Sequence, residues 1–302
     1  MTITLQNLYL KMDIYAQQFK NSSRRTSGEA GRVHKGCMTK PNPEVQQRGN
    51  LKCEAYIRWK VVCAYDGTAY NGWQSQVTKN TIQNSVEGAL EKILKNKVII
   101  QGSGRTDAGV HAQGQVFHFD ASWAHGPEKL MVALNSKLPQ TIQILSIQAT
   151  PPTFHARYSA KRKRYSYSLY LGYAPPRESH YTWSLGSKQI NISAMRAAAI
   201  HLVGKHDFKA FGAQRRAKTE PNPVKEIFKI IIKKGRGKYL KIIVEGSGYL
   251  YKMVRSIVGT LVYVGLGKLQ PKDVLEILKN KKRVPLIHTA PSKGLVLDKV
   301  FY

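Results

Sequence analysis

A glycine-rich segment holds the residues of this chain whose types and spacing are best suited to chemistry. It runs from Gly102 to His111 and reads GSGRTDAGVH. A dinucleotide-binding fingerprint, GxGxxG, would need glycine where Asp107 stands, and a phosphate-binding P-loop would need lysine directly after Gly109. Both patterns fail, and a carboxylate aimed at phosphates would repel them. The segment is therefore predicted to be a tight loop that presents Asp107, with small residues that let a ligand approach the backbone.

A single carboxylate such as Asp107 can serve as a nucleophile, a general base or a metal ligand. The metal role is disfavoured, because a hard cation needs several oxygen ligands and no two aspartates of residues 56–302 are spaced as a ligand pair. His111 follows four residues later without an HExxH or CxxC motif, which excludes a zinc deaminase. Among the chemical roles, covalent chemistry by the carboxylate, without a metal or an organic cofactor, is the sharper hypothesis. On the pattern alone, an ordinary turn in which Asp107 bonds only its own backbone is the plainer interpretation.

The charge balance indicates a polyanionic partner. The chain has 302 residues, with 48 Lys and Arg against 18 Asp and Glu, a formal net charge of +30. Residues 1–55 carry nine of the basic and four of the acidic residues, so most of the excess belongs to residues 56–302. This distribution favours a nucleic-acid-binding surface, and the basic runs 161–164, 215–218 and 279–283 are predicted to contact phosphates. A generally basic proteome is the alternative explanation.

Around the loop, short strands alternate with helices, which predicts an α+β fold. Alternating apolar and polar residues predict strands at 56–65, 98–100, 117–119, 142–147, 165–171, 224–233, 239–245 and 295–301. Helices are predicted after Thr81, from Pro127, from Asn191 to Gly204, over 251–266 and over 271–281. The strands at 224–233 and 239–245 read as a hairpin, so the sheet is expected to be mainly antiparallel. Asp107 would then follow a short strand, and Arg255 would lie in a long apolar helix.

Three segments are predicted along the chain. Residues 1–55 show no sustained period and read as a flexible N-terminal extension. Residues 56–152 would form an N-terminal catalytic half that carries the loop, and residues 153–302 a C-terminal half that completes the cleft. The longest charge-free apolar run, 256–267, is too short to span a bilayer, and three cysteines without a CxxC pair fit a reducing, cytoplasmic compartment. Organellar targeting by the extension is an alternative that its acidic residues disfavour.

Seven motifs in this chain resemble those of the tRNA pseudouridine synthase A (TruA) family, in the same order. They are residues 65–68 with 72–74, 104–111, 154–160, 163–167, 206–208, 253–259 and 290–295. The resemblance covers residues 56–302 and implies a pseudouridine synthase fold, with two related halves around a central sheet flanked by helices. It further implies a homodimer that binds tRNA and isomerises uridine to pseudouridine at positions 38 to 40 of the anticodon stem-loop. No metal and no organic cofactor would take part.

The resemblance also implies a role for each candidate site residue. Asp107 would be the nucleophile, and Arg255 would be the cation that pairs with it and favours its ionised form. Arg105 would hold the flipped-out nucleotide or fill its place in the stem. Tyr165 would stack on the uracil, and it is a candidate base for the C5 proton. Without the resemblance, the plainer interpretations would be a surface ion pair for Arg105, a place in the core for Tyr165 and a solvent-facing position on a helix for Arg255. Structural roles are assigned to the histidines of the motifs, His111, His155 and His206.

An RNA stem as substrate requires many basic residues that can bind its phosphates, and this chain has them. A uridine inside an A-form stem is out of reach, so an enzyme acting on it must extrude the base and grip the surrounding phosphates. A non-catalytic tRNA-binding protein or RNA chaperone is one rival, although a mere binder has no need for a carboxylate facing RNA. A nuclease is another rival, and it would need the clustered carboxylates or paired histidines that this sequence lacks.

Overall fold

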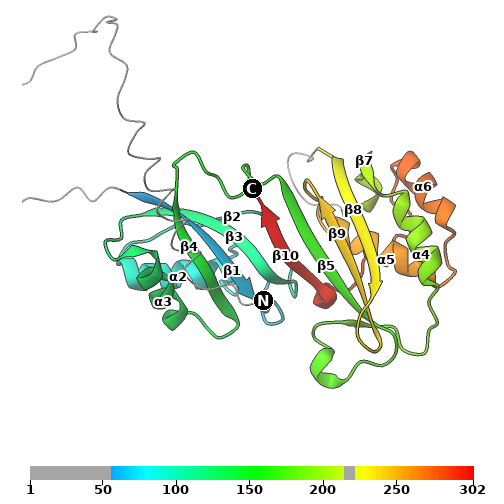
Figure 1. Ribbon diagram of the computed structural model, residues 1–302, viewed down its shortest axis with the longest axis horizontal. Helices are drawn as coiled ribbons and strands as arrows, with labels where there is room; N and C mark the ends of the chain where they lie inside the picture. The colour runs from blue at the N-terminus through cyan, green and yellow to red at the C-terminus, as the bar shows by residue number, and fades with distance from the viewer. Residues whose placement is uncertain (1–55, 214–221) are drawn as a thin grey trace, which may run out of the picture. The chain divides into compact units, whose positions relative to one another are not determined.

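The computed structural model describes residues 56–213 and 222–302 and contains one large sheet. The predictions for residues 1–55 and for the basic run 215–218 lie outside the described residues. In spatial order the strands run β4-β1-β3-β10-β5-β9-β8-β7, with β2 beside β3 and β6 beside β5 (Figure 1). Every neighbouring pair is antiparallel except β10 with β3 and β5 with β6. The predicted α+β class with a mainly antiparallel sheet is confirmed.

The described part of the chain contains the following elements. The strands are β1 Ile57–Tyr65, β2 Gln101–Gly102, β3 His111–Ala121, β4 Ile142–Thr150, β5 Arg162–Tyr170, β6 Trp183–Ser184, β7 Gly204–Asp207, β8 Val224–Lys234, β9 Tyr239–Gly246 and β10 Leu295–Phe301. The α-helices are α2 Ile82–Leu94, α3 Gly126–Lys137, α4 Ile192–Ile200, α5 Met253–Gly265 and α6 Pro271–Asn280. Short 3₁₀ helices form at η2 Pro176–Glu178, η3 Lys209–Phe211 and η4 Ser292–Gly294.

The last strand of the chain, β10, lies near the middle of the sheet. It pairs in parallel with the start of β3, through Val296 opposite His111, and antiparallel with β5, through Leu297 opposite Tyr165. Helices α2 and α3 lie beside β1 to β4, whereas α4, α5 and α6 lie beside β8 and β9 (Figure 1). Because β10 hydrogen-bonds to a strand from each side of residue 152, the two halves share one sheet. Their division at residues 152 and 153 stays a prediction.

Local sequence explains where several helices begin. The Thr81 side chain accepts a hydrogen bond from the Asn84 N–H, and Asn191 caps α4 in the same way through the Ala194 N–H. Helix α2 buries one stripe of apolar side chains, as its periodicity predicts. Helix α5 is buried almost all round, with Arg255 as its one charged residue. A charge in such a helix needs a partner inside the protein.

Several predicted boundaries were wrong: β3, β4 and β5 extend beyond the predicted ranges 117–119, 142–147 and 165–171, and three further differences follow. The strand expected at 98–100 instead forms at Gln101–Gly102, where the chain pairs with Phe117 and His118 of β3. The helix from Asn191 ends at Ile200 rather than Gly204, because Gly204 already opens β7 against β8. The helix expected from residue 251 begins at Met253, because the preceding Lys252 has a left-handed backbone with φ of 57°.

Candidate active site

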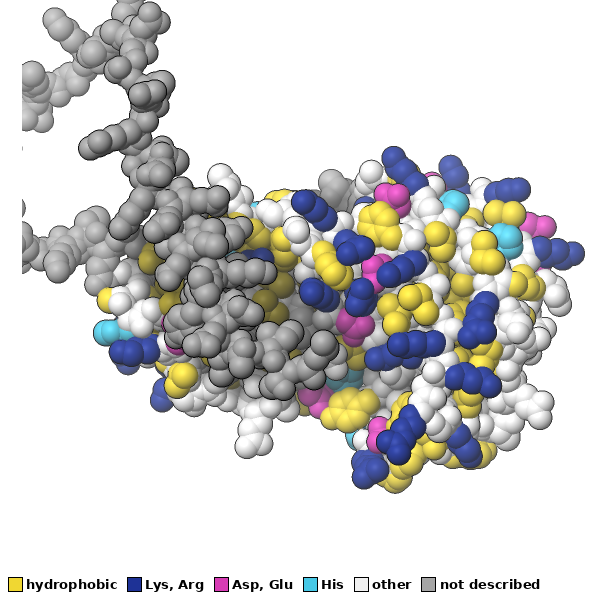
Figure 2. Space-filling model, in the orientation of Figure 1, with side chains coloured by type: hydrophobic (Ala, Val, Ile, Leu, Met, Phe, Trp, Pro, Cys, Tyr) yellow, Lys and Arg dark blue, Asp and Glu magenta, His cyan; other side chains and the backbone are white. Residues whose placement is uncertain are grey.

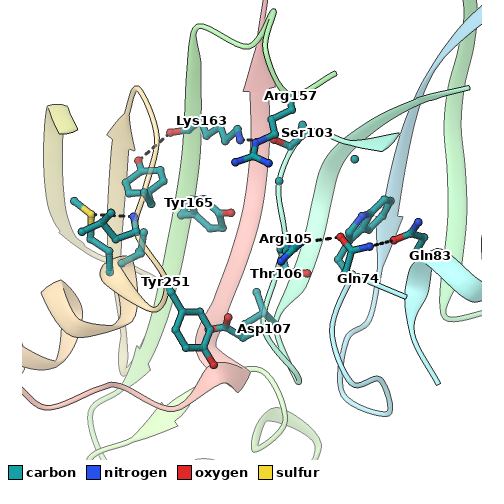
Figure 3. Close-up of a pocket in the computed structure, with 18 of the residues that line it drawn as sticks. Gln74, Gln83, Ser103, Arg105, Thr106, Asp107, Arg157, Lys163, Tyr165 and Tyr251 are labelled. Atoms are coloured by element: carbon teal, nitrogen blue, oxygen red, sulfur yellow. Dashed lines mark hydrogen bonds between the residues drawn. The ribbon is translucent and has the colours of Figure 1, made fainter. Parts of the chain in front are cut away.

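The loop between β2 and β3 borders a cavity of about 530 Å³, a size typical of sites that hold small molecules. The other walls come from β5, from residues 249–251 and from the start of α5. Figure 3 draws Arg105, Asp107, Lys163 and Tyr165 around this space. All four predicted site residues, Arg105, Asp107, Tyr165 and Arg255, line it. The structure thus brings together residues that lie up to 150 positions apart in the chain.

Hydrogen bonds from neighbouring segments hold the loop from both sides. The Trp73 N–H donates to the Thr106 carbonyl oxygen at 3.1 Å, and the Thr106 hydroxyl shares a buried hydrogen bond of 2.8 Å with Tyr65. On the β3 side, Gln115 donates to the Gly104 carbonyl oxygen at 3.0 Å. The neighbouring turn comes so close that a Cβ on Gly72 would lie 2.5 Å from the Thr106 oxygen. The motif at 65–74 therefore shapes the loop that presents Asp107.

Asp107 forms an ion pair with Arg255. The Arg255 Nη1 lies 3.0 Å from the Asp107 Oδ2, and the two side chains are 14% and 20% exposed. The Arg255 Nε donates to the Ala290 carbonyl oxygen at 2.7 Å, while the Ala290 N–H donates to the Arg255 carbonyl oxygen at 3.0 Å. Segment 288–290 can approach α5 this closely because residue 259 is glycine, where a Cβ would lie 2.0 Å from the His288 oxygen. The Asp107 carboxylate is thus paired with Arg255 and largely shielded from water, and it still lines the cavity.

Tyr165 lies on β5 with 8% of its surface exposed, and its ring meets the edge of Tyr249 at a centroid distance of 5.4 Å. Burial raises the pKa of Tyr165, and the negative charge of Asp107 raises it further. The side chain is therefore a neutral phenol at neutral pH. A phenol can stack on a base and donate a hydrogen bond, but it is poorly prepared to accept a proton. The predicted role as base for the C5 proton stays a prediction, and this pKa disfavours it.

Arg105 is oriented by a row of amide side chains that the sequence reasoning missed. Its Nε donates to Gln74 Oε1 at 3.0 Å, and Gln74 Nε2 donates to Gln83 Oε1 at 2.8 Å. Gln83, which is 6% exposed, in turn donates to Glu87 Oε1 at 2.8 Å. Because α2 carries both Gln83 and Glu87, the position of Arg105 depends on that helix. In the sequence, Gln74 belongs to the motif at 72–74, but no role was predicted for it.

Successive side chains of the basic run 161–164 point to opposite faces of the sheet, because they alternate along β5. Arg162 and Arg164 form ion pairs with Glu245 of β9, at 3.3 Å and 2.6 Å. Lys163 points the other way and lines the cavity, where its ammonium donates to the Ser103 carbonyl oxygen at 2.5 Å. Burial lowers the pKa of Lys163 to about 8, with a further contribution from the charge of Arg157. Sequence reasoning counted Lys163 only as one of several phosphate contacts.

Other predicted contacts serve the fold. Arg283 is exposed, and its guanidinium donates to Ser256 Oγ at 3.1 Å, the Ile287 carbonyl oxygen at 3.1 Å and Thr289 Oγ1 at 2.9 Å. His111 Nδ1 lies 3.2 Å from the Gly67 nitrogen and 3.1 Å from Asp66 Oδ1, and its Nε2 lies 3.2 Å from the Lys293 carbonyl oxygen. His206 Nε2 donates to the Val203 carbonyl oxygen at 2.9 Å. His155 lines the cavity, and its Nδ1 accepts from the backbone N–H groups of Arg157 and Tyr158.

Two features are absent from residues 56–213 and 222–302. Nowhere in these ranges do three or more His, Cys, Asp or Glu side chains gather in a group that could hold a metal ion. The helices in these ranges are also too short or too polar to cross a membrane.

Comparison with known proteins gives a consistent result. A family model described as tRNA pseudouridine synthase matches residues 61–159 and 198–302. A tRNA pseudouridine synthase A from Thermoanaerobacter sp. (strain X514) is 43% identical over 80% of this chain and 98% of its own length. Proteins of the same name from Protochlamydia amoebophila and Bacillus subtilis are 41% and 40% identical, over 81% and 82% of this chain and 96% and 99% of their own lengths.

Proposed function

The chain belongs to the tRNA pseudouridine synthase A family and is an isomerase that makes pseudouridine in tRNA, and we propose that Asp107 is its nucleophile. We propose further that the target uridines are those at positions 38 to 40 of the anticodon stem-loop. The observation that carries the assignment of Asp107 is its ion pair with Arg255 inside the cavity. The carboxylate is paired with a cation and only 20% exposed, which is a setting suited to covalent catalysis.

The reaction balances without any redox partner. The bond between N1 and C1′ of uridine breaks, and a bond between C5 and C1′ forms. The proton on C5 is lost, and N1 gains one, so the product has the mass of the substrate. Asp107 would form and then release a bond to the nucleotide, and no metal or organic cofactor is needed for these steps.

The other site residues suit the handling of an extruded base. Arg105 would hold the displaced nucleotide from the rim of the cavity, and the buried ring of Tyr165 offers a face for stacking on uracil. On the face drawn in Figure 2, Lys and Arg side chains outnumber Asp and Glu. This excess supports tRNA as the partner, because A-form RNA is gripped mainly through its phosphates.

Two further properties belong to the proposal. The enzyme would act as a homodimer that positions one tRNA across both subunits, and it would act in the cytoplasm. The support for both is membership of the family. Sedimentation of the protein with and without tRNA would test the first, and localisation of the tagged full chain would test the second.

The test of Asp107 uses tRNA transcripts that carry tritium at C5 of uridine, because every turnover releases that hydrogen to water. Asp107→Asn should release no tritium while keeping its affinity for tRNA. Asp120→Asn is the matched control, since Asp120 lies on the strand after the loop and pairs with Arg58 away from the cavity. Normal turnover by Asp107→Asn would remove Asp107 from the nucleophile role. Binding without tritium release by the wild type would favour the rival, a non-catalytic RNA-binding protein.

A further inference from the structure

Two cations line the cavity beyond the residues used above. Lys163 comes from β5, and Arg157 comes from the segment between β4 and β5. Figure 3 shows their charged ends beside each other and beside Ser103, away from Asp107. Neither side chain contributes to the chemistry proposed for Asp107, Arg105 or Tyr165.

Lys163 has hydrogen-bonding capacity left over. An ammonium group has three donors, and one of them is used by the Ser103 carbonyl oxygen at 2.5 Å. The approach is close because residue 104 is glycine, where a Cβ would lie 2.9 Å from the Lys163 Nζ. The remaining donors lie at the wall of the cavity, where a ligand could accept them.

The charge of this pair is not balanced by the protein. Within residues 56–213 and 222–302, neither Lys163 nor Arg157 forms an ion pair with an aspartate or a glutamate. The pKa of Lys163 is lowered to about 8 by burial and by the repulsion of Arg157. Holding the Lys163 charge away from water next to the exposed Arg157 costs free energy, and a bound anion would reduce that cost.

The surroundings of the pair suit a nucleotide. The Tyr158 side chain is 76% exposed, and the Arg157 guanidinium lies 5.7 Å from the centre of its ring. The ring centre of His155 lies 4.3 Å from that of Tyr158. Because most of the Tyr158 surface is exposed next to Arg157, a base could stack there while its phosphate is bound.

We propose that Lys163 and Arg157 form a phosphate-binding subsite, separate from the Asp107–Arg255 pair, that holds a phosphodiester of the RNA strand next to the extruded uridine. The inference rests on the proposed function, because it places the target nucleotide in this cavity. Lys163 also bonds Ser103, four residues before Asp107, so phosphate binding would steady the loop that presents the nucleophile.

The test measures the affinity of anticodon stem-loop RNAs that carry one uncharged methylphosphonate at each phosphate around the target uridine in turn. All proteins carry Asp107→Asn, which stops conversion under the proposed function, and the quantity measured is binding affinity rather than turnover. The parent protein should lose about 10-fold in affinity at one particular phosphate. Lys163→Gln and Arg157→Gln should bind unmodified RNA less tightly and lose little more when that phosphate is neutralised.

Two further variants make the result decisive. Lys129→Gln removes one exposed charge from α3, outside the cavity, and should respond to every methylphosphonate as the parent does. Lys163→Arg keeps the charge and should restore the sensitivity at the same phosphate. If Lys163→Gln shows the parent's full loss at every position, the subsite is wrong, whatever its overall affinity. If the methylphosphonate at that phosphate lowered the affinity of Lys163→Arg and Lys163→Gln equally, the proposed subsite would also be wrong.

Discussion

The guanidinium of Arg255 lies between the Asp107 carboxylate and the backbone of Ala290, with Nη1 3.0 Å from the Asp107 Oδ2 and Nε 2.7 Å from the Ala290 oxygen. Two atoms of one planar group are thus fixed at once. The carboxylate therefore has a defined direction as well as a balancing charge. That direction depends on segment 288–290 as much as on α5.

Arg255→Lys should lower turnover strongly, although it preserves the charge. Lysine offers a single charged nitrogen, which cannot contact Asp107 and Ala290 in the same planar geometry. We expect kcat to fall by about 10²-fold or more, because misplaced reacting groups carry penalties of that size. Tritium release under saturating tRNA measures the effect. Arg196→Lys is the control, since Arg196 donates to the Ile232 carbonyl oxygen through two nitrogens outside the cavity. Equal kcat for the two variants would contradict the positioning role.

Gly259→Ala should destabilise the protein and reduce its activity. The added Cβ would lie 2.0 Å from the His288 carbonyl oxygen, so α5 and segment 288–290 must separate. Forced separation of packed backbone costs about 1–3 kcal/mol, and it moves the oxygen of Ala290 that orients Arg255. Gly88→Ala is the matched control in α2, because nothing lies within 4 Å of its added Cβ. That variant should gain about 0.5–1 kcal/mol. Urea unfolding measures both, and a stable, active Gly259→Ala would refute the close contact.

Much of this architecture could be predicted from local sequence. Thr81 and Asn191 cap their helices because a short polar side chain can accept from the N–H three residues on, which is a local interaction. The loop around Asp107 was identified because its glycines and its lone carboxylate exclude the common phosphate loops. The motif match then brought in Arg255, Arg105 and Tyr165.

The remaining features depend on contacts that sequence patterns do not carry. The run 161–164 reads as one basic patch, yet strand alternation sends Arg164 to Glu245 and Lys163 into the cavity. Arg283 reads as a surface charge, yet it bonds oxygens of segment 287–289 and Ser256. Ala290 contacts Arg255 through its backbone carbonyl and N–H groups, and a contact of this kind cannot be predicted from the residue type. Each of these outcomes is decided by tertiary packing between distant segments.

Glu245→Gln should lower stability at neutral pH. The carboxylate, 1% exposed, lies among Arg162, Arg164 and Lys229, and removing its charge leaves three cations facing one another. We expect a loss of about 1–3 kcal/mol, since the cations themselves are partly solvated. Glu226→Gln on the adjacent strand β8 removes an exposed carboxylate and is the control. Urea unfolding at pH 7 measures the difference, and an equal effect of the two substitutions would contradict the network.

The same network predicts how the effect depends on pH. Burial alone would raise the pKa of Glu245, but the hydrogen bond and charge of Arg164 and the charge of Lys229 outweigh it and lower the pKa. The stability that this glutamate contributes is therefore present above the pKa of the unfolded chain and is lost as the pH falls through the lowered folded value. The gap between wild type and Glu245→Gln should be full near pH 6 and close in acid.

Affinity for RNA should fall as the pH rises past the pKa of Lys163, which is about 8 in the free protein. Only the charged ammonium attracts a phosphate, so deprotonation weakens binding, and a bound phosphate raises the same pKa. Between pH 7 and 9 the loss should approach the roughly 10-fold worth of one charge-assisted contact. This window lies above the ordinary range of histidine and below that of lysine. The other charged or titratable groups that line this cavity include Arg157, Arg105, Arg255, Asp107, His155 and Lys252. Arginine keeps its charge throughout this window, and the raised pKa values of Tyr165 and Tyr249 keep both phenols neutral. Lys163→Arg should therefore bind with nearly constant affinity across the window, and Lys163→Gln should bind weakly and equally flatly. A decline in Lys163→Arg as steep as in the wild type would assign the titration to another group.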